Sequence, residues 1–294
     1  MRVLVTGSTG LLGSKLVESF TAKGHEVYSG YNKHKPRIGF PVKLDITDEV
    51  EVKKIFKNVK PEVVVHAAAL TNVDECESNK ELAWKTNVSA TKSIAQQSQK
   101  HNALLIYVSS DYVFDGLKGL YEEEDEPNPI NHYGLTKLEG EKQVSKIAGQ
   151  FCIVRPSVIY GAEPASGKEN FALWILENLK KGKPVNVVED QWNSPTLNTN
   201  LAGMILEVAE KKLTGVYHLA GAARVSRYEF AKLIAQTFDL DQELIKPISL
   251  KELSWIARRP VDSSLNVSKA MKALRDKPLE IKSALEELKK ELVQ

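Results

Sequence analysis

Short apolar runs alternate with longer amphipathic stretches along the first 160 residues of the chain. The runs are rich in Val and Ile and are bounded by Gly, Pro or charged residues, a pattern that predicts buried strands. We expect these strands at residues 2–6, 26–30, 62–66, 104–109 and 151–155. The stretches between them have helical periodicity, and we expect helices at residues 11–22, 49–56, 80–100 and 133–146.

This order of elements predicts the fold class. Strands that alternate with helices form right-handed crossovers, which give a parallel sheet covered by helices on both faces. A strand buried on both faces should be continuously apolar, and Val63-Val64-Val65 has this property. We therefore expect an α/β fold built on a doubly wound parallel sheet of the Rossmann type.

The pattern loosens after about residue 160, where Gly, Pro, Ser and Asn predict loops at residues 161–170 and 189–198. We expect further helices at residues 171–180, 201–211, 226–238 and 280–292, and strands at residues 184–188 and 215–219. Residues 1–160 are expected to form the Rossmann domain. Residues 161–294 are expected to form a small C-terminal lobe that is interleaved with the Rossmann core and is not an independent domain.

Composition narrows the class of protein. The formal net charge is only +2 and no basic stripe is interleaved with aromatic residues, which argues against a nucleic-acid partner. No apolar run has the length of a membrane span and no charged leader is visible, so we expect no membrane partner and a cytoplasmic protein. Cys76 and Cys152 lack metal-ligand spacing and are expected to be structural thiols in a reducing compartment. The acidic run at residues 122–126 predicts a solvated loop, and no metal site is expected.

A glycine-rich turn at residues 6–13, Thr-Gly-Ser-Thr-Gly-Leu-Leu-Gly, joins the first strand to the first helix. Gly7 permits a tight turn, Gly10 lets the backbone approach a pyrophosphate, and Gly13 lets the helix pack closely on the strand. The N-terminus of the helix then offers unpaired N–H groups to the phosphates. We expect a dinucleotide here, bound by Gly7, Thr9, Gly10, Leu11 and Leu12. The alternative is a tight turn without a ligand.

The segment after the second strand bears on which dinucleotide is bound. An acidic residue about 20 positions after the glycines usually holds the ribose 2′-hydroxyl of NAD, but residues 31–37 contain only basic and neutral side chains. Asn32 and Lys33 are therefore expected to face a 2′-phosphate, which predicts NADP(H) as the cofactor. The alternative is a solvated run of surface charge. Asp45 and Ile46 follow the next apolar residue and are expected to lie near the adenine.

A second motif predicts redox chemistry on a carbonyl group. Tyr133 and Lys137 are four residues apart and share one helix face, so the Lys137 ammonium is expected to favour the phenolate and lower the pKa of Tyr133. Ser110 follows the fourth strand and is expected to hydrogen-bond the reacting oxygen, while Tyr133 delivers its proton and a dinucleotide supplies hydride. The alternative is an exposed Tyr–Lys pair, but the glycine turn and Ser109-Ser110 both fall where parallel sheets bind ligands.

Together these motifs resemble the extended short-chain dehydrogenases/reductases. The resemblance also rests on His66-Ala67-Ala68-Ala69, on Asn87, and on Arg155-Pro156-Ser157-Val158-Ile159-Tyr160-Gly161. It implies that Ser110, Tyr133 and Lys137 are catalytic and that Asn87 supports a proton-relay water. It also implies that Tyr133 and Lys137 contact the cofactor together with Ala67, Ala68, Ala69, Ser109 and Ser157.

Within that family, the stretches 109–116, 133–141, 189–196 and 258–266 look most like the dTDP-4-dehydrorhamnose reductases. The resemblance implies NADPH-dependent reduction of the 4-keto group of a nucleotide-linked deoxysugar, and hence a nucleotide-sugar partner. The substrate contacts it implies are Asp111, Val113, Trp192 and Arg259. Trp192 would stack on the base or else pack in the lobe, and Arg259 would grip the diphosphate or else lie exposed. Where those reductases often carry a tryptophan, this chain has Val158.

Other assignments stay open at this stage. The regulatory beta subunit of methionine adenosyltransferase shares the stretch at 109–116, and it is a binding protein on the same fold. Sugar dehydratases of the family place Asp-Glu after the catalytic hydroxyl residue, whereas this chain has Asp111-Tyr112, and epimerases usually retain the acidic NAD residue. The helix at residues 80–100 is a candidate homodimer face.

Overall fold

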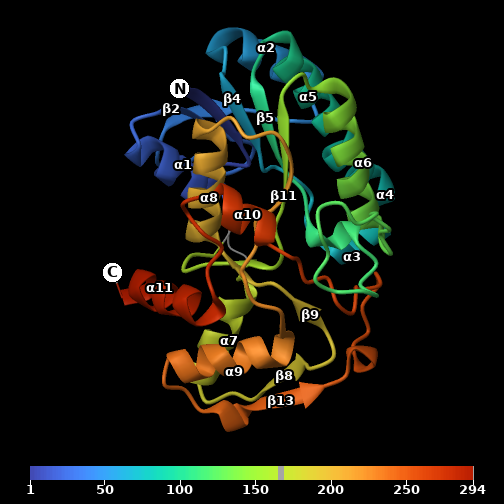
Figure 1. The fold of residues 1–294 in the computed structure, drawn as a ribbon, viewed down its shortest axis with the longest axis vertical. Helices are drawn as coiled ribbons and strands as arrows, with labels where there is room; N and C mark the ends of the chain where they lie inside the picture. The colour runs from blue at the N-terminus through green and yellow to red at the C-terminus, as the bar shows by residue number, and fades with distance from the viewer. Residues whose placement is uncertain (165–168, 294) are drawn as a thin grey trace.

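The centre of the molecule is a seven-stranded parallel sheet in the order β11-β6-β5-β4-β1-β2-β3. The structure, a computed structural model, describes residues 1–164 and 169–293. Figure 1 shows the sheet above a smaller lobe. The strands of the sheet are β1 (Arg2–Thr6), β2 (Glu26–Tyr31), β3 (Phe40–Lys43), β4 (Val63–His66), β5 (Leu104–Val108), β6 (Phe151–Arg155) and β11 (Gly215–His218). The expected α/β doubly wound parallel sheet is confirmed.

Helices cover both faces of this sheet (Figure 1). One face packs against α1 (Gly13–Ala22) and α8 (Asn198–Glu210), and its core includes Val3, Phe20 and Met204. The other face packs against α2 (Glu49–Val59), α5 (Ala90–Lys100) and α6 (His132–Ile147). Because both faces are covered, β4 and β5 are buried at every position, which explains their uninterrupted apolar sequences.

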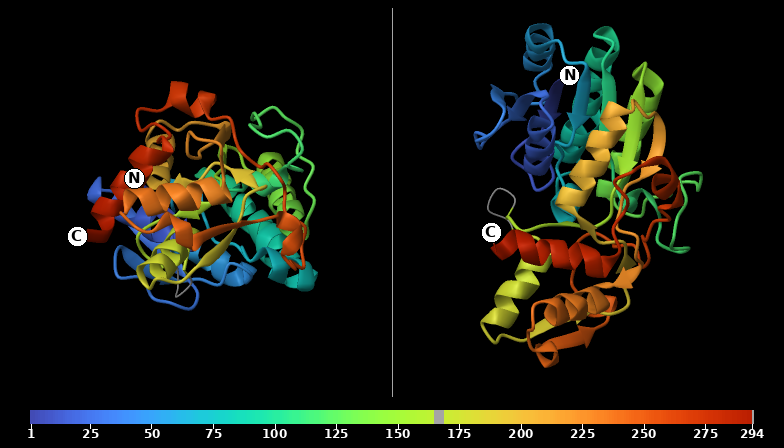
Figure 2. Two further views of the ribbon diagram at one scale, coloured as in Figure 1. Left: turned by 90° about the horizontal axis from the view of Figure 1, so that it is seen from below. Right: turned by 60° about the vertical axis from the view of Figure 1, so that its left-hand side comes forward.

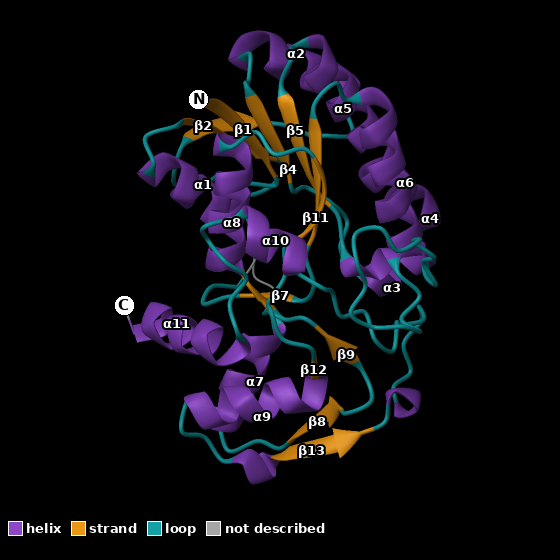
Figure 3. Ribbon diagram, in the orientation of Figure 1, coloured by secondary structure: helices purple, strands orange, loops and turns teal. Residues whose placement is uncertain are grey.

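The smaller lobe lies beyond the carboxyl ends of the strands (Figures 2 and 3). It contains three two-stranded sheets, β10 with β7, β12 with β9, and β13 with β8, around a separate apolar core. Its strands are β7 (Ile159–Tyr160), β8 (Val185–Val188), β9 (Trp192–Asn193), β10 (Thr196–Leu197), β12 (Val225–Ser226) and β13 (Ile245–Ile248). Its helices are α7 (Phe171–Lys180), α9 (Arg227–Thr237), α11 (Ile281–Val293) and the short η3 (Gln242–Leu244) and η4 (Leu250–Glu252).

The second part of the chain returns to the sheet before it completes the lobe. Helix α8 covers one face of the sheet, and β11 pairs with β6 at the sheet edge. Helix α10 (Ser268–Ala273) then packs beside β11. Of the loop expected at 161–170, residues 165–168 lie outside the described residues.

The long helix expected at residues 80–100 is interrupted. It consists of α4 (Lys80–Trp84), a π-helical turn η1 (Lys85–Ser89) and α5, and it is preceded by α3 (Val73–Ser78). Helical structure therefore covers the whole expected range, and only the change to π-helical hydrogen bonding at Lys85–Ser89 was not predicted. Strands β3 and β13 were not expected because each is short and contains a proline, Pro41 or Pro247, which argues against a strand. Helix α10 has only six residues, too few for its periodicity to be visible.

No helix in residues 1–164 and 169–293 is long and apolar enough to cross a membrane. Cys76 and Cys152 are both buried and carry free thiols.

A buried carboxylate fastens α8 to the C-terminal segment. Glu207 is 4 % exposed and accepts hydrogen bonds from the backbone N–H groups of Arg275 and Asp276, while the Lys211 ammonium lies 2.6 Å away. Burial on its own would raise the pKa of Glu207, but the ammonium and the two N–H groups outweigh it and lower the pKa to about 2.

Glu207 should therefore contribute to acid stability. Its pKa is lower in the folded than in the unfolded protein, so its contribution is complete above about pH 5 and is lost as the pH falls toward about 2. We expect Glu207→Gln to lower the free energy of unfolding by on the order of 2 kcal/mol at neutral pH and by much less near pH 3. Thermal unfolding across this range measures the difference. An equal loss at both pH values would contradict the assignment.

Candidate active site

A cleft of about 740 Å³ opens at the carboxyl ends of β1, β4, β5 and β6. This is the edge at which open parallel sheets bind ligands. The residues that line it include most of those selected from the sequence: Gly7, Thr9, Gly10, Leu11, Leu12, Asn32, Lys33, Ala67, Ala68, Ala69, Ser109, Ser110, Asp111, Tyr133 and Lys137. The cleft also includes Gly13 of the glycine turn, Tyr31 and His34 of the basic run, and Pro156, Val158 and Ile159 of the motif at 155–161. No motif had pointed to the remaining lining residues, Thr71, Val108, Glu169 and Asn170.

The glycine turn forms the floor of the cleft. Gly7 has φ of +68°, and a Cβ atom there would lie 2.8 Å from the Cα of Ala68 on the neighbouring strand end. A Cβ at Gly13 would lie 2.0 Å from the carbonyl oxygen of Gly7. The turn therefore needs glycine at both positions, and it leaves the amino end of α1 open toward the cleft. These features fit a dinucleotide diphosphate, which the Gly7–Leu12 backbone would hold.

The rim beyond β2 is basic. Lys33 and His34 line the cleft beside Asn32, and all three side chains are exposed. Asp45 does not line the cleft. It accepts hydrogen bonds from the backbone N–H and hydroxyl of Thr47 at 2.9 and 2.8 Å, and it bonds the Asn32 side chain, and these bonds lower its pKa. Ile46 is 9 % exposed and packs in the core, so neither residue contacts the cleft directly.

The charge at Lys33 gives a test of cofactor choice. We expect Lys33→Glu to weaken NADPH binding by about tenfold or more and to leave NADH binding nearly unchanged, because only NADPH carries the 2′-phosphate. Fluorescence titration with each dinucleotide measures this. Lys35→Glu is the matched control, since Lys35 is equally exposed but does not line the cleft. Equal effects of the two variants would mean that the run is only surface charge.

Tyr133 and Lys137, both on α6, line the cleft. The helix begins at His132, where the side chain of Asn131 caps it by accepting the Gly134 N–H at 2.8 Å. A Cβ at Gly134 would lie 2.1 Å from the carbonyl oxygen of Tyr112, so glycine allows the first turn to lie against the Ser110 segment. As a result Tyr133 hydrogen-bonds Ser110. Both residues are buried, with 9 % of Tyr133 and 7 % of Ser110 exposed.

The expected lowering of the pKa of Tyr133 by Lys137 is not seen. Burial raises the pKa of Tyr133 well above its ordinary value, and the nearby Asp111 carboxylate raises it further. Lys137 instead donates from Nζ to the carbonyl oxygen of Val108 at 2.7 Å and lies over the Tyr107 ring, 4.3 Å from its centroid. Burial lowers the pKa of Lys137 to about 7, although Glu141 raises it in part.

Lys137 should therefore lose its ammonium near neutral pH in the free protein. We expect the dissociation constant for NADP(H) to rise above about pH 7, because the neutral amine attracts the cofactor less strongly. Calorimetric titration between about pH 6 and about pH 9 measures this. Lys137→Arg retains a charge at every such pH and should abolish the rise. A flat profile in the unsubstituted protein would contradict the low pKa of Lys137.

Asn87 lies behind the cleft rather than in it. Its Nδ2 donates to the Leu70 carbonyl oxygen and to the Thr136 hydroxyl, both at 3.0 Å, and its Oδ1 accepts the Leu70 N–H at 2.8 Å. The side chain is 1 % exposed, and both of its N–H groups are used. The structure thus shows Asn87 joining η1, the loop at Leu70 and helix α6, with no N–H group left for the relay water that the resemblance implied.

A buried ion pair fixes α6 against two strand ends. Arg155, at the end of β6, donates to both carboxylate oxygens of Glu141 at 2.9 and 2.7 Å, and Ser109 Oγ donates to Glu141 at 2.5 Å. His218 Nδ1 lies 3.3 Å from the carbonyl oxygen of Asn266, which can only accept, so its Nε2 must accept from Arg155. Sequence analysis assigned no role to Glu141 or Arg155, although both stand in stretches that carried the resemblance.

Besides Asp45 and Ile46, four further expected contacts do not line the cleft: Val113, Ser157, Trp192 and Arg259. Val113 is fully buried against Phe114 and Tyr121 and cannot touch a substrate. Ser157 donates to Asp111 and does not line the cleft. Arg259 is paired with Asp74 of α3 at 3.0 Å, and the Arg224 guanidinium lies 4.9 Å from the Trp192 ring, so both residues already contact side chains of the protein. These pairings come from distant segments, which single-sequence spacing does not reveal.

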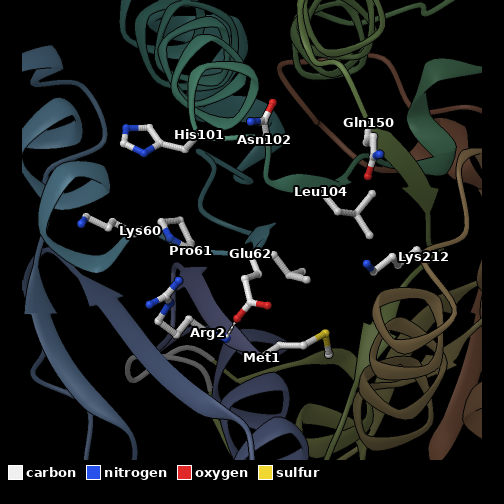
Figure 4. Close-up of a pocket in the computed structure, with 11 residues that line it drawn as sticks. Met1, Arg2, Lys60, Pro61, Glu62, His101, Asn102, Leu104, Gln150 and Lys212 are labelled. Atoms are coloured by element: carbon white, nitrogen blue, oxygen red, sulfur yellow. Dashed lines mark hydrogen bonds between the residues drawn. The ribbon is translucent and has the colours of Figure 1, made fainter.

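A second hollow, of about 440 Å³, lies at the opposite, amino ends of the strands. Figure 4 shows Arg2, Lys60, His101 and Lys212 around it, with Glu62 accepting the Arg2 N–H at 2.8 Å. Helices α2, α5 and α8 end beside it, so the basic side chains offset the negative ends of the helix dipoles. This hollow holds none of the motif residues.

The whole chain, residues 1–294, matches the family described as the RmlD substrate binding domain. The chain belongs to that family. Among relatives, this RmlD-family chain is 35 % identical over 271 residues to a probable low-salt glycan biosynthesis reductase of Haloferax volcanii, covering 91 % of this chain and 90 % of that protein. It is 32 % identical to the dTDP-4-dehydrorhamnose reductase of Aggregatibacter actinomycetemcomitans, covering 98 % of each. It is also 34 % identical to the methionine adenosyltransferase 2 subunit beta of Xenopus tropicalis, covering 92 % of this chain and 82 % of that protein.

Solved structures agree with this assignment. The crystal structure of dTDP-4-dehydrorhamnose reductase from Bacillus anthracis in complex with NADP has a TM-score of 0.89 to this RmlD-family chain at 31 % identity, with 99 % of each chain covered. A dTDP-4-dehydrorhamnose reductase of Clostridium acetobutylicum has a TM-score of 0.89 at 33 % identity, with 100 % of each chain covered. The resemblance found in the sequence is confirmed.

Proposed function

We propose that this protein is an NADPH-dependent reductase that converts the 4-keto group of a nucleotide-linked deoxysugar to an alcohol, with dTDP-4-dehydrorhamnose as substrate and dTDP-L-rhamnose as product. One observation carries the proposal: Ser110, Tyr133 and Lys137 meet in the same cleft as the glycine turn and the basic rim. The similarity to dTDP-4-dehydrorhamnose reductases extends along the whole chain, which supports a nucleotide sugar as the substrate.

Different residues of the cleft are assigned to the cofactor and to the carbonyl oxygen of the substrate. The NADP bound to the Bacillus anthracis enzyme suggests the same cofactor here, and such a cofactor supplies hydride. The backbone of Gly7 to Leu12 would bind its diphosphate, and Lys33 would bind the 2′-phosphate. Lys137 places an ammonium beside the site for the ribose, and Tyr133 and Ser110 hydrogen-bond the carbonyl oxygen.

The proton comes from Tyr133. Its raised pKa keeps the phenol protonated at neutral pH, and a phenol that holds its proton is ready to donate it to an oxygen that gains negative charge. Ser110 then stabilises the same oxygen through its hydroxyl group. The resting site therefore contains the phenol, which is the form that reduction consumes, whereas the opposite direction begins from the phenolate.

The alternative is a regulatory subunit that binds NADP(H) without catalysis, as the relationship to methionine adenosyltransferase 2 subunit beta raises. The intact Ser110, Tyr133 and Lys137 favour the enzyme. Co-purification with a methionine adenosyltransferase that is unaffected by Tyr133→Phe would favour the subunit instead.

The buried free thiols Cys76 and Cys152 support a reducing compartment and hence the cytoplasm. Exposed apolar side chains on two neighbouring helices support a homodimer. Leu82 and Trp84 of α4 and Leu135 of α6 are 39, 41 and 37 % exposed, and the two helices contact each other. Sedimentation of the protein with and without Trp84→Lys tests the dimer.

Activity gives the direct test. We expect the protein to oxidise NADPH when dTDP-4-dehydrorhamnose is added, and Tyr133→Phe to lower kcat by about 100-fold or more, because the proton donor is removed. NADPH absorbance at its reduced-nicotinamide band measures the rate, and NADPH affinity should stay unchanged. Tyr228→Phe, on α9 in the lobe, is the matched control. Folded protein that binds NADPH but leaves the sugar unreduced would refute the proposal.

A further inference from the structure

One buried carboxylate gathers three serine hydroxyl groups behind the catalytic residues. Asp111 is 3 % exposed, and its Oδ1 accepts from Ser110 Oγ at 3.0 Å. Its Oδ2 accepts from Ser157 Oγ at 2.8 Å and from Ser263 Oγ at 2.7 Å. Ser110 follows β5, Ser157 follows β6, and Ser263 belongs to the C-terminal part of the chain. Asp111 therefore joins the Rossmann sheet to the C-terminal segment. Both carboxylate oxygens are thus already bonded within the protein.

Counting hydrogens fixes the direction of these bonds. Burial raises the pKa of Asp111, but the three serine hydroxyl groups and Arg227 favour its ionised form. A serine hydroxyl has one hydrogen, and an ionised carboxylate can only accept. The Ser110 hydrogen therefore points to Asp111, while Ser110 Oγ accepts the Tyr112 N–H at 3.1 Å. The hydrogen bond between Ser110 and Tyr133 must then use the hydrogen of the phenol. The resting order is Tyr133 to Ser110 to Asp111, with every hydroxyl directed toward the carboxylate.

The bond from Ser110 is the one that can be released. At 3.0 Å it is longer than the bonds from Ser157 and Ser263, at 2.8 and 2.7 Å, so Asp111 keeps its two shorter hydrogen bonds when Ser110 turns away. An ionised group that retains two donors loses less than one that is left unpaired. Ser110 also lines the cleft, whereas Ser157 and Ser263 do not, so only the Ser110 hydroxyl can turn toward a ligand.

We propose that Asp111 is a positioning residue that acts through Ser110: it holds the Ser110 hydrogen away from Tyr133 in the resting site and yields it to the carbonyl oxygen of a bound substrate. This inference rests on the proposed reductase function for its last step. Asp111 is then not a substrate ligand, as the sequence had implied, but the residue that decides where the Ser110 hydrogen points.

The arrangement also keeps the proton on Tyr133. A hydrogen bond donated by Ser110 would lower the pKa of Tyr133, and Ser110 cannot donate that bond while its hydrogen points to Asp111. The carboxylate charge of Asp111 also disfavours a second negative charge nearby. The other titratable groups that face Tyr133 are Cys76 and Tyr112, which also raise its pKa, and Lys137 lies one helical turn away. Arg227 faces Asp111 from α9 and offsets part of its charge.

The pKa of Tyr133 can be measured without a substrate. Fluorotyrosine incorporated into the full-length protein lowers the phenol pKa into a range where the fold survives, and the ¹⁹F signal lost in Tyr133→Phe identifies the residue. We expect Asp111→Asn to lower the pKa of this phenol by about one unit or more, because the carboxylate charge is removed. Ser263→Ala keeps the charge and should not lower it. An unchanged pKa in a folded Asp111→Asn protein would overturn the proposal.

Kinetics separate positioning from substrate binding. Ser263 reaches the cleft only through Asp111, so a substrate-binding role for Asp111 predicts no effect of Ser263→Ala on kcat. We expect Ser263→Ala to lower kcat about threefold to tenfold at unchanged KM for the sugar nucleotide, since Asp111 then holds the Ser110 hydrogen more tightly. A higher KM in Asp111→Asn, together with an unaffected Ser263→Ala, would show that Asp111 binds substrate and that the proposal is wrong.

Two further comparisons keep the outcomes distinct. If Asp111→Asn does not fold, Ser263→Ala and Ser157→Ala carry the same test, because each removes one of the two shorter hydrogen bonds. If the unsubstituted protein leaves dTDP-4-dehydrorhamnose unreduced, the proposed function fails, while the ¹⁹F titration still decides whether Asp111 controls Tyr133.

Discussion

The position of α6, the helix that carries Tyr133 and Lys137, depends on the buried ion pair between Arg155 and Glu141. Arg155 belongs to β6 and Glu141 to α6, and the pair lies at 2.7 Å with both side chains almost fully buried. Removal of one partner of such a pair leaves an uncompensated charge and costs about 3–5 kcal/mol. Because Ser109 bonds the same carboxylate, the ends of β5 and β6 are held to α6 at one point, one helical turn from Lys137. The geometry of the Tyr133–Lys137 face follows from this point.

Two polar clusters then complete the site from opposite sides. Asn87 joins the buried Thr136 of α6 to the loop at Leu70, whereas Asp111 accepts a hydrogen bond from Ser110. Neither cluster depends on a bound ligand, because all these partners are groups of the protein itself. The site is therefore built before a cofactor arrives, and binding energy need not be spent on arranging the residues that react.

The sequence predicted the elements that are long or strongly patterned. The glycine turn, the five central strands and the Tyr133–Lys137 spacing are local features, so periodicity and motif spacing were enough. The hydrogen bonds of Asp111, the Asp74 partner of Arg259 and the burial of Val113 join residues that are far apart in the chain or depend on packing. A single sequence contains no signal for such pairings, and for that reason it did not reveal that Val113 is buried or that Trp192 and Arg259 contact other side chains of the protein. The pKa of Tyr133 was misjudged for the same reason, since the spacing to Lys137 says nothing about burial.

The π-helical turn at Lys85–Ser89 holds one residue more than an α-helix of the same height would need. Deleting one residue of this turn would regularise the helix at nearly the same height, but Asn87 lies within the turn, so the deletion would change which side chain faces Leu70 and Thr136. Asn87 and Leu70 could then no longer meet. In an ordinary surface helix a one-residue gap is often absorbed by fraying, whereas here the number of residues between Leu70 and Thr91 is itself under constraint.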